Sequence, residues 1–403
     1  MTENLNLDQD LGVPGEGSSS TDAGSFSDAV PAADGDVFNE PKSPAQAVDA
    51  DGANSMTEKT HGVLYIGMDL GTSRTSISAS NGVRESVYSL VGYPKDIVSR
   101  KLLKKDVLFG KEAVEKRLSL KMFKPLEAGV LKYTGDSSMD EEAKQNIKAA
   151  RDLIGEAIRL ARPRKDELVY CVIGAPAEAS MRNKEAIIEA AREHVDSVML
   201  CSEPFSVAYG LDWLEDVLVC DIGAGTTDLC RMHGTMPEEA DQVMFDIAGD
   251  AIDAELSRLV TASCPGAQFS MQMIKDIKER HGFFGEAAEP VLVDLPVDGK
   301  PTTFDLTNQV REACSILVDP IIDGIQQLIS TFDPEFQERL KNRVLLAGGG
   351  SRVTGLDRAV ERAMNERLGG GKCISIEEPI YGGSNGALKI AHDMPEEFWE
   401  KLK

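Results

Sequence analysis

The sequence predicts an α/β protein built from two similar halves. Apolar strands alternate with helical stretches along residues 62–403, a pattern typical of buried sheets covered by helices. An apolar strand that ends in an acid and runs into a turn rich in Gly and hydroxyl groups occurs at Asp69 and again at Asp221. A unit repeated at that distance indicates that the fold is internally duplicated.

The composition excludes several classes of protein. The net charge of −24 argues against nucleic acid as a partner, because a phosphate backbone needs cationic contacts. No apolar run approaches the ~20 residues that span a bilayer, and the N-terminus lacks a signal peptide, so we expect no direct membrane insertion. The seven cysteines contain no C-x-x-C pair, which favours reduced thiols in a cytoplasmic protein.

Residues 1–60 differ in composition from the rest of the chain. They hold 12 acidic and 2 basic residues and are rich in Gly, Ser, Ala and Pro. Such a segment buries too little apolar surface to offset the entropy of ordering, so we predict a disordered acidic N-terminal extension. Its composition favours a solvated spacer over the alternative, a short tail that docks onto a partner.

The first half begins near Gly62. Residues 63–69 read as a strand and 75–80 as the return strand of a hairpin. Residues 93–168 are more charged and more helical, and we interpret them as an inserted subdomain. Three further elements complete this half: a strand at 169–173, an amphipathic helix at 183–194 and a strand at 198–201.

The second half repeats the opening theme. A strand at 217–221 and a return strand at 229–232 precede a second predicted insertion at 250–305. The later elements are a helix over 306–332, a strand at 344–347, a helix from about 356 and a last helix at 384–394. We therefore predict domain I over 61–202, completed by 380–403, and domain II over 203–379.

The two turns, DLGTS at 69–73 and DIGAGTTD at 221–228, have the composition of anion-binding loops. Glycines let backbone N–H groups approach one anion, and Thr and Ser add hydroxyl donors. Two such hairpins can grip a polyphosphate from both sides. Asp69 and Asp221 would repel phosphate unless a divalent cation stood between, and Mg²⁺ needs only one or two carboxylates. The alternative is a pair of ordinary hairpins with Asx turns. The occurrence of two turns with the same pattern argues against it.

Two further segments each allow a functional and a purely structural interpretation. The stretch LAGGGSRVTGL at 346–356 suits a nucleoside contact, or is only a tight turn between a strand and a helix. Glu203 follows Ser202, a plausible N-cap, and precedes Pro204. From these residues alone, Glu203 complements a helix dipole more readily than it orients a water molecule.

Other nucleotide-binding motifs fail. The sequence contains no G-x-x-x-x-G-K-[ST] loop. GAGTTD at 223–228 begins like a dinucleotide fingerprint, but Asp228 stands where the last glycine belongs, so a dehydrogenase is not expected.

Taken together, these segments resemble the actin, sugar-kinase and Hsp70 superfamily. DLGTS and DIGAGTTD are similar to its two phosphate motifs, and LAGGGSRVTGL is similar to its adenosine motif. SEPFSVAYG at 202–210 and GGSNGALKIA at 382–391 look like its two connecting segments. The chain most resembles the bacterial actins whose filaments align magnetosomes, with VGYPKDIVSRKLL at 91–103 among the matching stretches. The acidic extension departs from that pattern.

The resemblance implies an actin-like ATPase fold, with two duplicated α/β domains, an inserted subdomain in each and a nucleotide cleft between them. It also implies ATP and Mg²⁺ as cofactors and a role for each matching residue. Asp69 and Asp221 would hold hydrated Mg²⁺, and Glu203 would position the attacking water, so Glu203 and Asp221 are the implied catalytic residues. Lys278 would lie beside adenosine, although relatives often carry Glu where this chain has Lys275. The implied nucleotide contacts are Gly71, Thr72, Ser73, Gly223, Gly225, Thr226, Thr227, Gly348, Gly349 and Gly350.

The favoured function is therefore a cytoplasmic, filament-forming ATPase that uses hydrolysis for turnover and organises magnetosomes. Its expected partners are further copies of itself and magnetosome-associated proteins. A non-polymerising kinase of the same superfamily is the alternative, but no sugar-kinase signature is present. An Hsp70-like chaperone is not expected, because it needs a substrate-binding domain after the ATPase domain and the residues after the second connecting segment are too few to form one. A membrane-tethered relative is disfavoured because the C-terminal EEFWEKLK is short and acidic.

Overall fold

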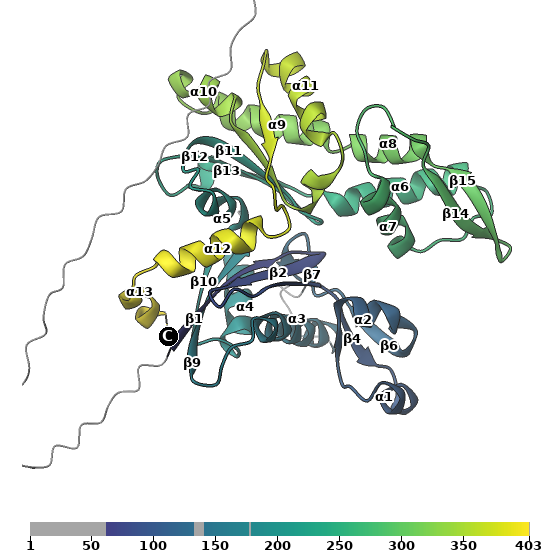
Figure 1. The fold of residues 1–403 in the computed structure, drawn as a ribbon, viewed down its shortest axis with the longest axis horizontal. Coiled ribbons are helices and arrows are strands. Elements are labelled where there is room, and N and C mark those ends of the chain that lie inside the picture. Colours follow the sequence, from purple (N-terminus) through teal and green to yellow (C-terminus); the bar gives the residue numbers. More distant parts are fainter. Residues whose placement is uncertain (1–61, 133–140, 177–178, 403) are drawn as a thin grey trace, which may run out of the picture. The chain divides into compact units, whose positions relative to one another are not determined.

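The computed structural model describes residues 62–132, 141–176 and 179–402. The predicted disordered extension, residues 1–60, lies outside the described residues. The described part contains two five-stranded sheets (Figure 1). The first, in spatial order, consists of β10 (Ser197–Ser202), β9 (Glu167–Ala175), β1 (Gly62–Leu70), β2 (Arg74–Ala79) and β3 (Arg84–Tyr88). The second consists of β13 (Gln242–Phe245), β12 (Thr227–His233), β11 (Glu215–Ile222), β16 (Val344–Ala347) and β17 (Cys373–Ser375).

The two sheets have the same topology. In the first, β1 pairs antiparallel with β2 and parallel with β9, and the outer pairs β2–β3 and β9–β10 are antiparallel and parallel. In the second, β11 pairs antiparallel with β12 and parallel with β16, with β12–β13 antiparallel and β16–β17 parallel. The duplication predicted from the two strand–acid–turn units is therefore confirmed.

Helices cover both sheets, each half has a hydrophobic core of its own, and a third cluster contains buried residues from both sheets. In the first core, Leu64 and Ile66 of β1 pack with Leu153 and Ile154 of a long helix, all fully buried. The helices that contribute to this core are α3 (Glu141–Leu160) and α4 (Met181–Arg192). Those of the second half are α6 (Gly249–Ser263), α7 (Met271–His281), α8 (Thr307–Ser315), α9 (Val318–Ser330), α10 (Pro334–Lys341) and α11 (Leu356–Leu368).

Two helices formed by the predicted connecting segments cross in close contact (Figure 1). They are α5 (Glu203–Gly210) and α12 (Gly382–Asp393). A Cβ atom added at Gly386 of α12 would lie 1.7 Å from the backbone oxygen of Ser206, so only glycine permits this approach. The glycines of both segments therefore serve packing as well as any ligand.

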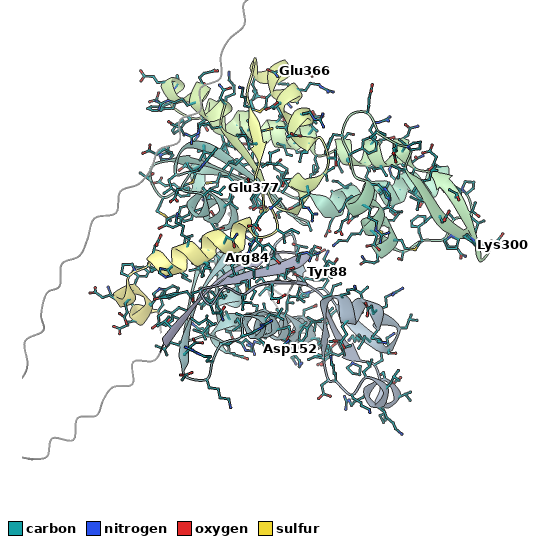
Figure 2. All side chains as sticks on the ribbon, in the orientation of Figure 1. Arg84, Tyr88, Asp152, Lys300, Glu366 and Glu377 are labelled. Atoms are coloured by element: carbon teal, nitrogen blue, oxygen red, sulfur yellow. The ribbon has the colours of Figure 1, made fainter. Side chains whose placement is uncertain are left out.

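The predicted insertions contain more strand than their composition suggested. The stretch 93–168 includes the strands of a small sheet ordered β5–β4–β6, a short hairpin and α3, which packs on the first sheet. The elements before α3 are β4 (Val91–Pro94), α1 (Ile97–Leu103), β5 (Leu108–Phe109), α2 (Gly110–Glu115), the 3₁₀ turn η1 (Arg117–Ser119), β6 (Leu120–Phe123), β7 (Leu126–Glu127) and β8 (Val130–Leu131). In the second half, a hairpin of β14 (Leu292–Val297) and β15 (Lys300–Asp305) follows α7, with Lys300 at its tip (Figure 2).

The single helix predicted over 306–332 is wrong in one respect, because two helices, α8 and α9, occupy that stretch. The break lies at residues 316–317, and Pro320 then falls in the first turn of α9. A proline there loses no helical hydrogen bond, whereas inside a continuous helix it would remove one and clash with the preceding turn.

The C-terminal segment belongs to the core. Helix α13 (Glu396–Lys401) places the Trp399 side chain in full burial, and its indole Nε1 donates a hydrogen bond to the Ala391 oxygen over 3.3 Å. No helix in the described part of the chain has the length and apolar character that crossing a membrane requires.

Candidate active site

One cavity of about 440 Å³ brings the three Gly-rich turns together. Residues from both halves of the molecule line it, including residues of α5 and α7. Every residue implicated from the sequence lines it except one. Those lining it are Asp69, Gly71, Thr72, Ser73, Glu203, Asp221, Gly223, Gly225, Thr226, Lys278, Gly348, Gly349 and Gly350.

Thr227 is the exception. Its side chain is fully buried, and its hydroxyl donates a hydrogen bond to the Ile247 oxygen over 2.8 Å. Because Thr227 begins β12, alternation along the strand turns its side chain away from the cavity that Thr226 lines.

The first turn is held from two sides. Its Gly71 oxygen accepts a hydrogen bond from Ser89 Oγ over 2.6 Å. On the other side, Thr72 Oγ1 accepts a hydrogen bond over 2.7 Å from the backbone N–H of Gly129, in the turn between β7 and β8. Both contacts preorganise the turn, and neither partner was apparent from the sequence.

The second turn is closed within itself and supported by α6. Gly223 N–H donates to the Thr226 oxygen over 2.9 Å, which closes the loop between β11 and β12. At the start of α6, Asp250 N–H donates to the Ala224 oxygen over 2.7 Å. The second turn therefore rests on the N-terminus of a helix that sequence analysis had assigned only to an insertion.

The third turn needs its first glycine. Gly348 has a φ of 74°, in the left-handed region, and a Cβ atom there would lie 2.3 Å from Asp221 Oδ1. The 3₁₀ turn η3 (Gly349–Arg352) follows at once, and Ser351 Oγ donates to the Gly348 oxygen over 2.8 Å. Glycine at 348 thus lets the third turn lie directly against the acid of the second.

Three buried acidic side chains, Asp69, Glu203 and Asp221, gather at this cavity. Burial raises the pKa of Asp69 to about 7. Burial, followed by the charge of Asp69, raises the pKa of Glu203 and of Asp221 well above the usual range. Asp228, opposite Asp221 in the β11–β12 register, adds to the effect on both. Such a cluster of carboxylates favours binding of a cation.

The donor set suits a hydrated divalent ion. Asp69 and Asp221 supply two carboxylates, and Mg²⁺ in a phosphate site uses one or two of these and retains several waters. The described residues hold no group of three or more His, Cys, Asp or Glu side chains arranged to coordinate a metal directly. A water-mediated site needs no such group.

Two lysines of α7 line the cavity and have different partners. Lys278 Nζ forms an ion pair with Asp253 Oδ1 over 2.8 Å and donates a hydrogen bond to the Gly249 oxygen. Lys275, noted from the sequence only as a departure from related proteins, instead reaches across to Ser73. The sequence carried no signal for the other cations at the cavity, Arg74, Arg280 and Arg352.

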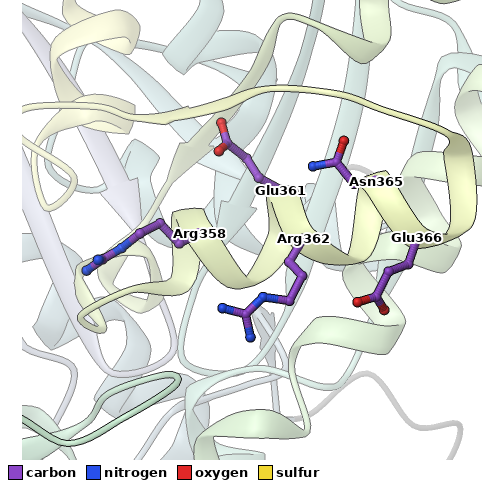
Figure 3. A pocket seen from close by; sticks show the side chains of 5 residues that line it. All are labelled: Arg358, Glu361, Arg362, Asn365 and Glu366. Atoms are coloured by element: carbon purple, nitrogen blue, oxygen red, sulfur yellow. The ribbon is translucent and has the colours of Figure 1, made fainter. Parts of the chain in front are cut away.

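A second hollow lies on α11 and contains none of the residues singled out from the sequence. It is lined by Arg358, Glu361, Arg362, Asn365 and Glu366 (Figure 3). Because its lining comes from a single exposed helix face with charges of both signs, it offers no converging set of donors for a phosphate.

Comparisons with known proteins agree with this architecture. The model of the MreB/Mbl protein family matches residues 64–371. The actin-like protein MamK of Paramagnetospirillum magneticum is 36% identical over 339 residues, which cover 84% of this chain and 95% of MamK. A double helical filament of MamK superposes with a TM-score of 0.78 at 36% identity, covering 83% of this chain and all of that one. A non-polymerising MamK mutant bound to AMPPNP superposes with a TM-score of 0.63 at 35% identity, with the same coverage.

Proposed function

Because the chain belongs to the MreB/Mbl family of actin-like proteins, we propose that it is an ATPase that polymerises into filaments with ATP and Mg²⁺. The observation that carries this proposal is the convergence of two duplicated strand–acid–turn units on one cavity. Similarity to MamK, whose filament and AMPPNP-bound structures superpose on this chain, supports both the polymer and the nucleotide.

Each turn has a chemical task in this proposal. Backbone N–H groups and hydroxyls of 71–73 and 223–226 bind the β- and γ-phosphates, and the glycines 348–350 face the nucleoside. Lys278 borders the nucleoside side of the cavity. Asp69 and Asp221 would hold Mg²⁺ through water, and the ion would supply positive charge that offsets the phosphates.

Glu203 is the proposed catalytic carboxylate. It begins α5 at the junction of the two halves, is 9% exposed, and lies in the same cavity as Asp69 and Asp221. Burial beside other acids raises its pKa, which suits a group that accepts a proton from water. Its task is to orient and activate the water that attacks the γ-phosphate.

In the proposal, identical subunits join by head-to-tail contacts that do not close into a ring, and such contacts generate a filament. In the proposal, hydrolysis weakens these contacts and permits turnover. We extend the proposal to organising magnetosomes, with magnetosome-associated proteins as partners, on the strength of the sequence similarity to MamK alone.

Sedimentation and phosphate release, measured on one sample of purified protein, test the proposal. We expect pelleting with ATP and Mg²⁺, release of phosphate after assembly, and much less pellet with ADP. Nucleotide turnover without any pellet or microscopic filament would favour the alternative, a non-polymerising kinase of the same superfamily.

A further inference from the structure

We infer that Lys275 binds the nucleotide phosphates and, through them, joins the two halves of the molecule across the cavity. This inference rests on the proposed nucleotide site and adds a residue to it. The lysine comes from α7 of the second half, whereas the turn that it meets comes from the first.

The contact itself spans the cavity. Lys275 Nζ donates a hydrogen bond to Ser73 Oγ, in the turn between β1 and β2. The ammonium lies 5.6 Å from the centre of the Tyr88 ring, at the end of β3 (Figure 2), and 3.8 Å from Glu279 Oε1. The Lys275 side chain is only 19% exposed, so its position is set by packing.

The ammonium retains capacity for a ligand. It carries three donors, and within the described residues one of them meets an acceptor at hydrogen-bond distance, namely Ser73. Burial lowers the pKa of Lys275, and the nearby charge of Glu279, whose Oε1 lies 3.8 Å from the ammonium, offsets this lowering only in part. An anion at this place would restore the missing stabilisation.

The other lining cations are differently engaged. Lys278 is paired with Asp253, and Arg74 donates to Ser86 Oγ over 3.1 Å with its guanidinium over Tyr88. Arg280 and Arg352 are exposed. In the part of the chain that the structure describes, Lys275 is thus the half-buried lysine of the cavity whose ammonium contacts the 71–73 turn, through Ser73.

Phosphate is the ligand that fits this ammonium. A lysine binds phosphate oxygens as a compact point charge. Asp69, Glu203 and Asp221 line the same cavity, so a polyphosphate there needs positive charge from the protein as well as from a metal. An oxygen that bonded both the 71–73 turn and Lys275 would tie α7 to the first sheet.

The test compares binding of ATP, ADP and adenosine to three full-length variants by equilibrium titration. Lys275→Met should weaken ATP and ADP binding about 10- to 100-fold, the range for a hydrogen bond to a charged group, and leave adenosine binding unchanged. Lys275→Arg, which keeps the charge, should recover most of the loss. The control Lys144→Met removes an exposed lysine of α3 and should behave as wild type.

Three outcomes would overturn the inference. Equal losses for ATP and adenosine would make Lys275 a support of the nucleoside pocket, and unchanged affinities would remove it from the site. Wild-type protein that binds none of the three ligands would instead refute the proposed function, and the inference with it. If Lys275→Met does not fold, Lys275→Gln, which keeps a donor to Ser73 without the charge, takes its place.

Discussion

Trp399 stacks on Tyr170, with the ring centroids 5.0 Å apart and the ring planes inclined by 16°. The contact joins α13 to β9 of the first sheet, and Ser197 Oγ of β10 donates to the Trp399 oxygen over 3.1 Å. The last helix therefore covers the edge of a core and leaves its tryptophan unavailable to any surface. A role of this residue in membrane attachment, weighed from the sequence, does not fit such burial.

This packing predicts a stability effect. Trp399→Ala should lower the free energy of unfolding by about 3–5 kcal/mol, because it leaves a large cavity and strands the partner of the indole N–H. The neighbouring Phe398 is 47% exposed, so Phe398→Ala should cost roughly 1 kcal/mol or less. Urea denaturation of both variants measures the difference, and equal midpoints would contradict the assignment.

Removing Asp221 should separate function from stability. Asp221→Asn keeps the shape of a buried side chain but removes a carboxylate that lies near Asp69 and Asp228. Phosphate release should fall by about 10²–10³-fold, because charge stabilisation is usually the largest catalytic contribution. The melting temperature without nucleotide should not fall.

The matched control is Asp106→Asn, at a side chain that is 94% exposed, which should leave phosphate release unchanged. Normal Mg²⁺-dependent turnover in Asp221→Asn would refute the metal assignment.

Substitution of Glu203 should separate catalysis from assembly. Glu203→Ala should bind ATP and polymerise, because a carboxylate without a metal does not attract phosphate. Hydrolysis should drop by about 10²–10⁴-fold, the usual contribution of an acid–base group, and filaments should accumulate. Phosphate release and sedimentation on one sample provide the measurement.

Glu289→Ala, at an exposed loop position, serves as the control for that variant. Normal hydrolysis by Glu203→Ala would reduce Glu203 to a helix-start residue, and failure to bind ATP would make its role structural.

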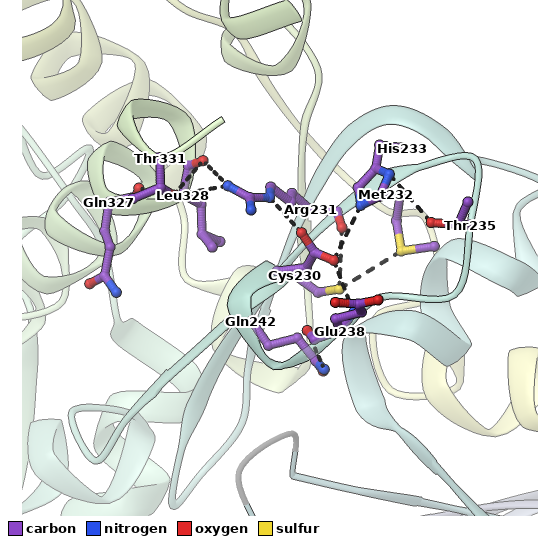
Figure 4. A network of polar contacts seen from close by, with 11 residues as sticks. Cys230, Arg231, Met232, His233, Thr235, Glu238, Gln242, Gln327, Leu328 and Thr331 are labelled. Carbon is purple, nitrogen blue, oxygen red and sulfur yellow. Dashed lines mark hydrogen bonds and ion pairs between the residues drawn. The ribbon is translucent and has the colours of Figure 1, made fainter. Parts of the chain in front are cut away.

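A buried ion pair should make stability depend on acid pH. Arg231 Nε donates to Asp241 Oδ1 over 2.7 Å, and both side chains are 7% exposed. Figure 4 shows the network of polar contacts around Arg231. Burial by itself raises the pKa of Asp241, but hydrogen bonds from Glu238 N–H, Arg231 and His233 outweigh it and lower the pKa overall. The carboxylate therefore stabilises the fold fully above its unfolded-state pKa near 4.

That stabilisation should disappear as the pH falls through the lower folded-state pKa of Asp241. Asp241→Asn should cost about 3–5 kcal/mol at pH 7, because Arg231 is left buried without its anion. The variant should also show a flatter decline of unfolding free energy between about pH 4 and pH 2. Parallel pH profiles of wild type and variant would show that Asp241 does not carry the dependence.

Local sequence was sufficient for most strands of the two large sheets, the duplication and the three turns, but it missed the edge strands β3, β13 and β17 and the short strands of the inserted segments. A short apolar run predicts a buried strand. Glycine and hydroxyl residues that are adjacent in the chain, as at 69–73 and 221–228, predict an anion-binding turn. The break between α8 and α9 was readable in principle from Pro320, but the apolar periodicity on both sides of it favoured one helix.

Only the tertiary structure decided which distant side chains meet. Lys275 and Ser73 are 202 residues apart, Thr72 and Gly129 are 57 apart, and the partners of Trp399 lie in another part of the chain. Composition and periodicity describe one segment at a time, whereas these contacts depend on how two sheets and two crossing helices pack. The sequence thus determined the parts of the cavity, and packing between the halves determined which charges face each other within it.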